Sequence, residues 1–290
     1  MRKSIKLFFP IFILMIFFHH ADAEAFEKVW ETKGFHNPES AVYDAKESVL
    51  YVSNMDGEAL KKDGKGGVSK ISTEGKIIDL SWVKGMNAPK GVDIFQGNLY
   101  VSDIDRLVKI NLKTKATKSF PIPNAKFLND VAVDSVGNVY VSDMMDNSIH
   151  RVTKQGKVSV WLKDNKLEGP NGLLVIDDTL YVASWGIMKK GSTATSKMGN
   201  IKKVDINNKT ISQFGSSIPI GNLDGIEADG SGGFFITDWI HGKLMQVSSN
   251  GAIKGHTLLG QGSADLEYID KKKLLIVPMM KDGVVRAFSY

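Results

Sequence analysis

The sequence predicts an all-β fold, a closed six-bladed β-propeller, and three observations support this prediction. One apolar motif recurs six times, its copies follow one another at the spacing of propeller blades, and no stretch after residue 23 has helical periodicity. The motif is a β-rich run that ends in small polar residues, as in "LYVSDIDR" and "VYVSDMMD". The copies begin at residues 50, 99, 139, 180, 234 and 274. A period of about 40 residues is typical of propeller blades.

Each copy is the second of four strands that we expect in a blade. A short apolar strand and a turn precede it, as in "VAVDSVGN", while an alternating strand and an outer strand follow, as in "SIHRVT" and "KVSVWL". The sixth copy has only three strands, because the chain stops after "GVVRAFSY". The segment "FEKVWETKG" at 26–34 supplies the missing strand. We therefore expect the N-terminal strand to complete the last blade and to leave no open sheet edge.

Residues 1–23 are predicted to be a secretory signal peptide, and the propeller is predicted to occupy 24–290. "MRKSIK" is basic, "LFFPIFILMIFF" is apolar, and Ala21-Asp22-Ala23 has the small residues of a cleavage site. The apolar run is shorter than the roughly 20 residues of a spanning helix. We expect an exported protein, periplasmic or secreted, with no membrane span in the mature chain. An uncleaved anchor is the alternative.

The composition excludes several classes of function. The chain contains no Cys, so disulfides, thiolate chemistry, zinc–thiolate sites and iron–sulfur clusters are excluded. The net charge is +5, but the basic residues are scattered through turns and alternating strands. This distribution indicates solvated loops and no nucleic-acid surface. Because a closed ring has no edge that demands a partner, we expect a monomer.

A polar or charged residue precedes the innermost strand of every predicted blade, and we call these six residues the polar column. They are Glu39, Lys90, Asn129, Asn171, Asp224 and Asp265. Innermost strands line the central channel of a propeller, so these side chains should form a ring at one mouth of it. Lys90 either contacts an anionic substrate or pairs with Asp265, and we favour the pairing.

Oxygen ligands dominate the polar column. Two carboxylates and two amides, without Cys or His, predict a site for a hard divalent cation, Ca²⁺ or else Mg²⁺ or Mn²⁺. The alternative is that Asn and Asp begin strands because they form Asx turns. Since all six positions are polar, we favour the binding site.

At these residues the chain resembles the family of senescence marker protein (regucalcin), gluconolactonase and luciferin-regenerating enzyme. The matching stretches are "PESAVYD", "FLNDVAVDSVGNVYVSDM", "PNGLLVIDDTLYVASW" and "LDGIEADGSGGFFITDW", and the resemblance covers 26–290. It implies a central divalent metal held by Glu39, Asn171 and Asp224, with Asn129 assisting. It also implies hydrolysis of a lactone or similar ester, with a metal-polarised carbonyl and Asp224 as general base.

Two departures from the sugar-lactone members concern the substrate. Those members carry an Arg two residues before the third-blade Asn, where this chain has Phe127. The predicted rim around the channel mouth is also apolar. It comprises Trp185, Ile187, Met188, Trp239, Ile240, Met279 and Met280. Both departures favour a hydrophobic ester or lactone.

Among the residues expected to contact substrate are Lys90, Phe127, Trp185, Trp239, His241 and Met279. His36 and His241 are candidate acids or bases, although exposed loop histidines are the favoured interpretation. The leading hypothesis is thus an exported, metal-dependent hydrolase of a small lactone or ester. The alternative is a non-catalytic propeller that binds a small molecule or a protein through its hydrophobic rim.

Overall fold

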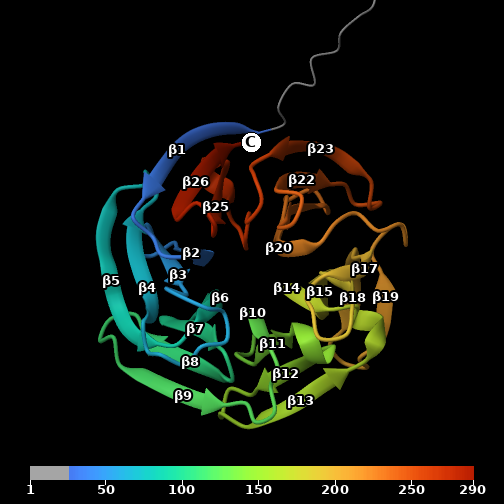
Figure 1. Cartoon of the computed structure of the whole chain (residues 1–290), viewed down its shortest axis with the longest axis horizontal. Helices are drawn as coiled ribbons and strands as arrows, with labels where there is room; N and C mark the ends of the chain where they lie inside the picture. Colours follow the sequence, from blue (N-terminus) through green and yellow to red (C-terminus); the bar gives the residue numbers. More distant parts are fainter. Residues whose placement is uncertain (1–25) are drawn as a thin grey trace, which may run out of the picture.

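The structure is a computed structural model that describes residues 26–290, and these form six four-stranded antiparallel sheets around a central axis (Figure 1). The predicted six-bladed propeller is therefore confirmed. The predicted signal peptide lies outside the described residues. No helix within 26–290 has the length and apolar character needed to cross a bilayer.

The first three blades follow one another along the chain, each from its innermost to its outermost strand. Blade 1 contains β2 (Pro38–Asp44), β3 (Val49–Asn54), β4 (Gly66–Ser72) and β5 (Ile77–Met86). Blade 2 contains β6 (Pro89–Phe95), β7 (Asn98–Asp103), β8 (Arg106–Asn111) and β9 (Thr117–Pro121). Blade 3 contains β10 (Leu128–Val133), β11 (Val139–Asp143), β12 (Ser148–Val152) and β13 (Val158–Lys163).

Blade 5 follows the same plan, whereas blade 4 has an inserted hairpin and blade 6 takes its outermost strand from the other end of the chain. Blade 4 contains β14 (Pro170–Ile176), β15 (Thr179–Ser184), β18 (Ile201–Asp205) and β19 (Ile211–Gln213), and the hairpin of β16 (Gly186–Met188) and β17 (Thr195–Met198) interrupts it. Blade 5 contains β20 (Leu223–Ala228), β21 (Phe234–Asp238), β22 (Lys243–Val247) and β23 (Ile253–Leu258). Blade 6 contains β24 (Glu267–Ile269), β25 (Leu274–Met279), β26 (Val284–Ser289) and β1 (Glu27–Lys33). Single 3₁₀ turns lie at Met144–Asp146, Asn165–Leu167 and Asp270–Lys272.

The N-terminal strand closes the ring, as predicted. β1 pairs antiparallel with β26, from Glu27 opposite Ser289 to Lys33 opposite Val284. The two ends of the described chain thus lie side by side in blade 6 (Figure 1). The pairing protects the edge of the last sheet and makes the propeller continuous.

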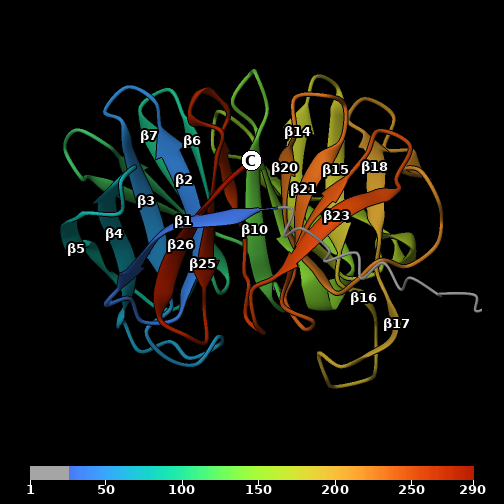
Figure 2. The ribbon, with the colours of Figure 1, turned by 90° about the horizontal axis from the view of Figure 1, so that it is seen from above.

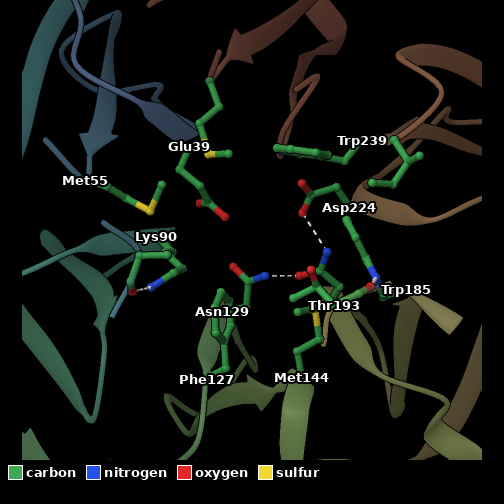
Figure 3. A pocket seen from close by; sticks show the side chains of 14 residues that line it. Glu39, Met55, Lys90, Phe127, Asn129, Met144, Trp185, Thr193, Asp224 and Trp239 are labelled. Carbon is green, nitrogen blue, oxygen red and sulfur yellow. Dashed lines mark hydrogen bonds between the residues drawn. The ribbon is translucent and has the colours of Figure 1, made fainter. Parts of the chain in front are cut away.

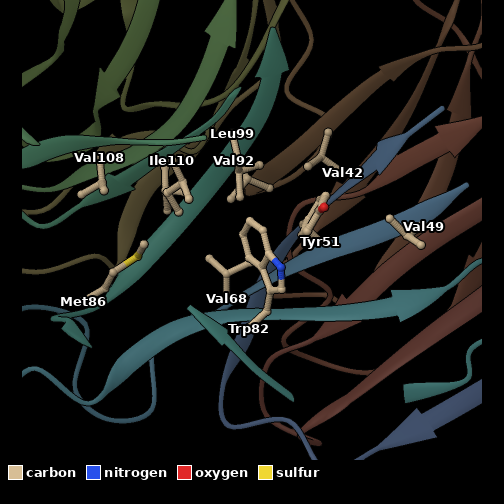
Figure 4. Packing of buried hydrophobic residues seen from close by; sticks show 11 residues of the cluster. Val42, Val49, Tyr51, Val68, Trp82, Met86, Val92, Leu99, Val108 and Ile110 are labelled. Atoms are coloured by element: carbon tan, nitrogen blue, oxygen red, sulfur yellow. The ribbon is translucent and has the colours of Figure 1, made fainter. Parts of the chain in front are cut away.

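The core lies between the faces of adjacent blades. Every residue of β3 is buried, because this second strand of its blade is covered on both faces. This explains why the recurring motif is a continuous apolar run instead of an alternating one. Between blades 1 and 2, Tyr51 packs on Trp82 with ring centroids 4.5 Å apart, and Leu99 and Val101 belong to the same cluster (Figure 4).

Candidate functional site

A backbone irregularity places the polar column in blades 1 to 5. The register of the innermost pair of strands shifts between Pro38 and Ala41, and the same shift recurs in the next four blades. At each shift two consecutive residues of the innermost strand have no opposite residue in the neighbouring strand, and the first of them is the column residue. A β-bulge re-aims side chains, so the column side chains can turn toward the axis.

Glycine after the column residue lets the innermost strands approach closely. A methyl group added at Gly172 would lie 2.0 Å from the carbonyl oxygen of Asp224 in the next blade. One added at Gly91 would lie 2.2 Å from a carboxylate oxygen of Asp130. Side chains larger than hydrogen are excluded there, which accounts for the "PNG" and "PKG" sequences.

Five of the six column residues converge on one cavity of about 160 Å³ at one mouth of the channel. They are Glu39, Lys90, Asn129, Asn171 and Asp224. Figure 3 shows that the side chains of Glu39, Asn129 and Asp224 point toward a common centre. Ala59 and Thr193 cover part of the same cavity, and the β16–β17 hairpin that carries Thr193 at its turn projects from the disc (Figure 2).

Asp265 does not line this cavity. Its segment pairs less regularly than in the other blades, because β24 begins only at Glu267 and a single isolated bridge, between Ser263 and Met279, precedes it. The main-chain N–H of Asp265 donates to the carbonyl of Glu39 at 3.0 Å, and its carboxylate accepts from Ser40 Oγ at 2.6 Å. Its side chain lines a second cavity of the channel, together with Asp93 and Asp130.

The predicted pairing of Lys90 with Asp265 is therefore wrong. The Lys90 ammonium donates to the carbonyl oxygens of Ala59 and Ala88, at 3.0 and 3.1 Å. It also lies 4.8 Å from the ring centroid of Phe127. The physical reason is that the Asp265 carboxylate is hydrogen-bonded to Ser40, outside this cavity. Main-chain carbonyls and an aromatic face surround the Lys90 ammonium instead.

The oxygen-bearing side chains form a short hydrogen-bonded chain. Asn129 Nδ2 donates to Asn171 Oδ1, and Asn171 Nδ2 donates to Asp224 Oδ1 at 2.8 Å and to the Leu223 carbonyl at 3.0 Å. Two oxygens of these side chains take no part in hydrogen bonding: Glu39 Oε2 and Asn129 Oδ1 are buried and have no partner. Buried acceptors without a partner are costly, so these two atoms indicate a missing ligand.

Burial also disfavours the charges of the two carboxylates. It raises the pKa of Glu39 well above its usual range, and the charges of Asp224 and Asp265 raise it further. Burial raises the pKa of Asp224 in the same way, with Asp265 adding to it and the Asn171 hydrogen bond opposing it. A cation between the two carboxylates would offset both effects.

The donor set suits a hard cation. Glu39, Asn129, Asn171 and Asp224 offer carboxylate and amide oxygens of the kind that Ca²⁺, Mg²⁺ and Mn²⁺ bind. No group of three or more His, Cys, Asp or Glu side chains within 26–290 is arranged for a metal ion. A site at this position would therefore depend on its two amides as well as on its two carboxylates.

The cavity wall above the polar column follows a rule that the sequence prediction did not use. The first residue after the second strand of each blade is apolar, and we call these six residues the apolar collar. They are Met55, Ile104, Met144, Trp185, Trp239 and Met280. All except Ile104 line the cavity, and Ile104 packs against Met55. Alignment of the six motif copies would have found the first five residues, but in the sixth copy it gives Met279, one residue before Met280.

The structure places Phe127, Trp185 and Trp239 on the cavity wall, where they were expected, and Ile240 joins them. Met279 does not lie there. It is the last residue of β25 and is fully buried in the core of blade 6, because side chains alternate along a strand and the next residue, Met280, faces the cavity.

The two loop histidines lie away from the cavity. His241 Nδ1 is 2.8 Å from a carboxylate oxygen of Asp238, and 44% of the His241 side chain is exposed. The side chain of His36 is 73% exposed, with Nδ1 4.0 Å from Asp56 Oδ1. Neither lines the cavity, so the expectation that His241 contacts substrate there is not met by this arrangement.

Comparison with known proteins agrees with the fold and identifies the family. The model of the SMP-30/Gluconolactonase/LRE-like region matches residues 37–262. The chain therefore belongs to the SMP-30/gluconolactonase/LRE-like family. A search of curated proteins finds no significant match.

Several solved structures share the fold at low sequence identity. A candidate gluconolactonase has a TM-score of 0.65 and 16% identity, over 91% of this chain and 92% of that one. A gluconolactonase from Xanthomonas campestris has a TM-score of 0.62 and 14% identity, over 91% and 86%. A catalytically inactive virginiamycin B lyase from Staphylococcus aureus, solved with quinupristin, has a TM-score of 0.60 and 16% identity, over 90% and 98%.

Proposed function

We propose that this chain is a divalent-metal-dependent hydrolase of a small lactone or ester. The observation that carries the proposal is the pair of buried acceptors without partners, Glu39 Oε2 and Asn129 Oδ1, beside Asp224. Family membership supports a lactonase-type activity. The gluconolactonase among the structural neighbours is consistent with the same proposal.

Glu39, Asn171 and Asp224 would hold the cation, with Asn129 assisting, and Ca²⁺ is the ion we favour over Mg²⁺ and Mn²⁺. Two carboxylates and two neutral amides limit the negative charge, which suits a cation that also takes water and substrate oxygens. When bound, the cation supplies Lewis acidity, which polarises a substrate carbonyl and stabilises the charge that develops on its oxygen.

Asp224 is the residue we assign as general base. Asn171 Nδ2 holds Asp224 Oδ1 at 2.8 Å, which orients the carboxylate across the cavity. In this position Asp224 can take the proton of an attacking water. A carboxylate beside a cation stays ionised and is a weak base, so its position contributes more than its proton affinity.

The apolar collar and Phe127 shape the cavity and so limit which substrates fit it. Trp185 and Trp239 pack with ring centroids 6.1 Å apart at one side of the cavity, and Met144 and Met280 also line it. A cavity of about 160 Å³ is close to one that holds a benzene molecule in other proteins. We infer that the buried part of the substrate is small and apolar, unlike a polyhydroxylated sugar lactone.

The test is an activity panel of γ- and δ-lactones and aryl esters, measured with calcium and with excess chelator. We expect turnover that chelation removes and calcium restores, and Asp224→Ala should lower kcat/KM by at least about 1000-fold. Asp270→Ala, at an exposed residue in a 3₁₀ turn, is the control and should match the wild type. A panel in which no compound reacts faster than with Asp224→Ala would sink the proposal.

One observation favours the alternative of a non-catalytic binding protein. Ile240, which lines the cavity, is 37% exposed, and Ile187, on the hairpin that carries Thr193, is 43% exposed. An apolar rim can mark a surface for a small molecule or a protein. Saturable binding without turnover across the panel would favour this function over hydrolysis.

We also propose that the protein is exported, periplasmic or secreted, after removal of residues 1–23. The support is the basic, apolar and small-residue order of the first 23 residues. The intact mass of the protein from its native cell shows the outcome, because cleavage after Ala23 leaves Glu24 as the first residue.

A further inference from the structure

Lys90 is the only cation of the polar column, and it is almost completely buried. It lies near the start of β6, is 2% exposed and lines the same cavity as Glu39 and Asn129. A buried lysine normally has a carboxylate partner, because an isolated charge is costly away from water. The surroundings of Lys90 are therefore informative about what the cavity binds.

The ammonium of Lys90 is held in place by neutral groups. Its acceptors among the described residues are the main-chain carbonyls of Ala59 and Ala88, and the face of Phe127 lies 4.8 Å away. An ammonium has three N–H donors, so one remains for a ligand. Contacts with carbonyls and an aromatic face orient the charge without neutralising it.

The carboxylates that act on Lys90 from a distance have other roles. Asp103 accepts from Arg106 Nη2 at 2.7 Å and from the main-chain N–H of Ala88 at 2.8 Å. Glu39 belongs to the proposed cation site. Burial lowers the pKa of Lys90 to about 8, and the charges of Glu39 and Asp103 oppose this shift, so the ammonium keeps its proton at neutral pH.

The backbone of blade 2 departs from the other blades around Lys90. In blades 1, 3, 4 and 5 the main-chain N–H of the collar residue donates to the carbonyl two residues before the column residue, as from Trp185 to Gly169 at 2.7 Å. In blade 2 the corresponding carbonyl, that of Ala88, accepts from the Lys90 ammonium.

The collar residue of the same blade, Ile104, has a φ of 57°. A β-branched residue is strained in this left-handed conformation, and such strain gathers at functional positions. The chain thus tolerates an unfavourable turn beside the carbonyl that holds the Lys90 ammonium.

We propose that Lys90 is a specificity-determining residue that binds a carboxylate group of the substrate. The preferred substrate is then a small apolar lactone or ester that also carries a carboxylate, with its reacting carbonyl at the Glu39 and Asp224 side of the cavity. This inference rests on the proposed function and deepens it. A carboxylate suits the site because it is compact, and its charge completes the ion pair that Lys90 lacks.

The experiment compares two γ-butyrolactones of the same shape, one with a ring carboxylate and one with an isopropyl group in its place. Hydrolysis is followed by proton release against the uncatalysed rate. We expect the wild type to prefer the carboxylate lactone by at least about 10-fold in kcat/KM. Lys90→Met should lower kcat/KM for the carboxylate lactone by about 10- to 100-fold and change the isopropyl lactone by less than about 3-fold.

Lys118→Met is the matched control. Lys118 Nζ lies 5.0 Å from the ring of Phe120 in the outer strand β9, so it repeats the contact of a lysine with a phenyl ring outside the cavity. This variant should leave both lactones unchanged. Equal losses for the two lactones in Lys90→Met would overturn the proposal and assign Lys90 to charge balance within the cation site.

Calorimetric titration separates this proposal from the proposed function. Phenylacetate and phenylacetone, a neutral molecule of similar shape, are titrated into the wild type and Lys90→Met. If no lactone is hydrolysed but phenylacetate binds at least about 10-fold more tightly than phenylacetone, and only with Lys90 present, the carboxylate site stands and the hydrolase falls. Equal affinity of the two compounds for the wild type would reject the carboxylate site.

Discussion

The two ends of the central channel carry the same kinds of side chain in opposite circumstances. At the cavity end, Glu39 Oε2 and Asn129 Oδ1 are buried without partners. Farther along the channel, Asp93 accepts from the main-chain N–H of Val133 and Glu267 from that of Tyr43, both at 2.7 Å. These carboxylates join the innermost strand of one blade to that of the next.

The difference separates structural acids from binding acids. The innermost strands of adjacent blades do not form a ladder of main-chain hydrogen bonds with each other. A carboxylate that accepts a main-chain N–H of the next blade supplies such a link, so it stabilises the ring. An acid oxygen without a partner destabilises the protein until a ligand arrives. Asp130 has one oxygen of each kind, since one accepts from Leu173 N at 2.6 Å and the other has no partner.

The largest expected effect tests the cavity end. Glu39→Gln removes a carboxylate from the proposed cation site, so the cation-free variant should melt at the wild-type temperature or above it, because burial disfavours the Glu39 charge when no cation is bound. For the wild type, calcium at about 100 times Kd should raise Tm by roughly 5–10 °C. A 100-fold weaker site would cut this shift to about 1 °C.

Differential scanning calorimetry with calcium, magnesium, manganese and chelator measures these shifts. Asp93→Asn is the paired variant at the other end of the channel, and it should keep the full calcium shift. An unchanged wild-type Tm with every cation would contradict the cation site. Equal loss of the shift in both variants would erase the proposed distinction between the two ends.

Much of this comparison could be read from the sequence, because it depends on repetition. The period near 40 residues and the three-stranded last copy predict the blades and their closure by β1. The column residues Glu39, Asn129, Asn171 and Asp224 also follow from the alignment of the repeats. Repetition reveals these positions since each blade places equivalent residues at equivalent sites.

The rest depended on non-local contacts or on single-residue offsets. Met279 and Met280 were both expected at the channel mouth, but β25 extends through Met279 and only Met280 lines the cavity, because apolar strand ends give no boundary signal. The partners of Lys90 were missed because Ala59 lies in a loop of the preceding blade. Local sequence does not report which carbonyl a distant loop brings to an ammonium.

A smaller effect is expected where a carboxylate is structural. Glu267→Ala leaves the main-chain N–H of Tyr43 without its acceptor, whereas Glu267→Gln retains an amide oxygen for it. The Ala variant should therefore be less stable than the Gln variant by about 1–3 kcal/mol. Urea unfolding of both variants measures the difference. Equal stability of the two would mean that this hydrogen bond does not hold blades 6 and 1 together.

The last expected effect is a pH dependence of stability that originates in the structural acids. Burial raises the pKa of Glu267 from 4.5 to about 8 and that of Asp93 from 3.8 to about 7, and the charge of Asp265 raises both further. Burial and the charge of Glu267 raise the pKa of the neighbouring Glu227 as well. At a pH between the ordinary pKa of each acid and its raised pKa in the folded protein, the folded chain binds more protons than the unfolded chain. The stability that comes from protonated Glu267 is thus complete below pH 4.5 and is lost as pH rises through about 8.

Melting temperatures between pH 5 and 9, in chelator, should therefore include a downward contribution that Glu267→Gln reduces, because an amide does not titrate. Glu74→Gln is the control for a carboxylate whose pKa is lowered, to about 2, by hydrogen bonds to Thr73 and Lys272, and it should keep the wild-type slope in this range. If Glu267→Gln and the wild type lose stability in parallel, the acids of this end do not titrate there. The two ends of the channel would then differ in hydrogen bonding alone and not in charge.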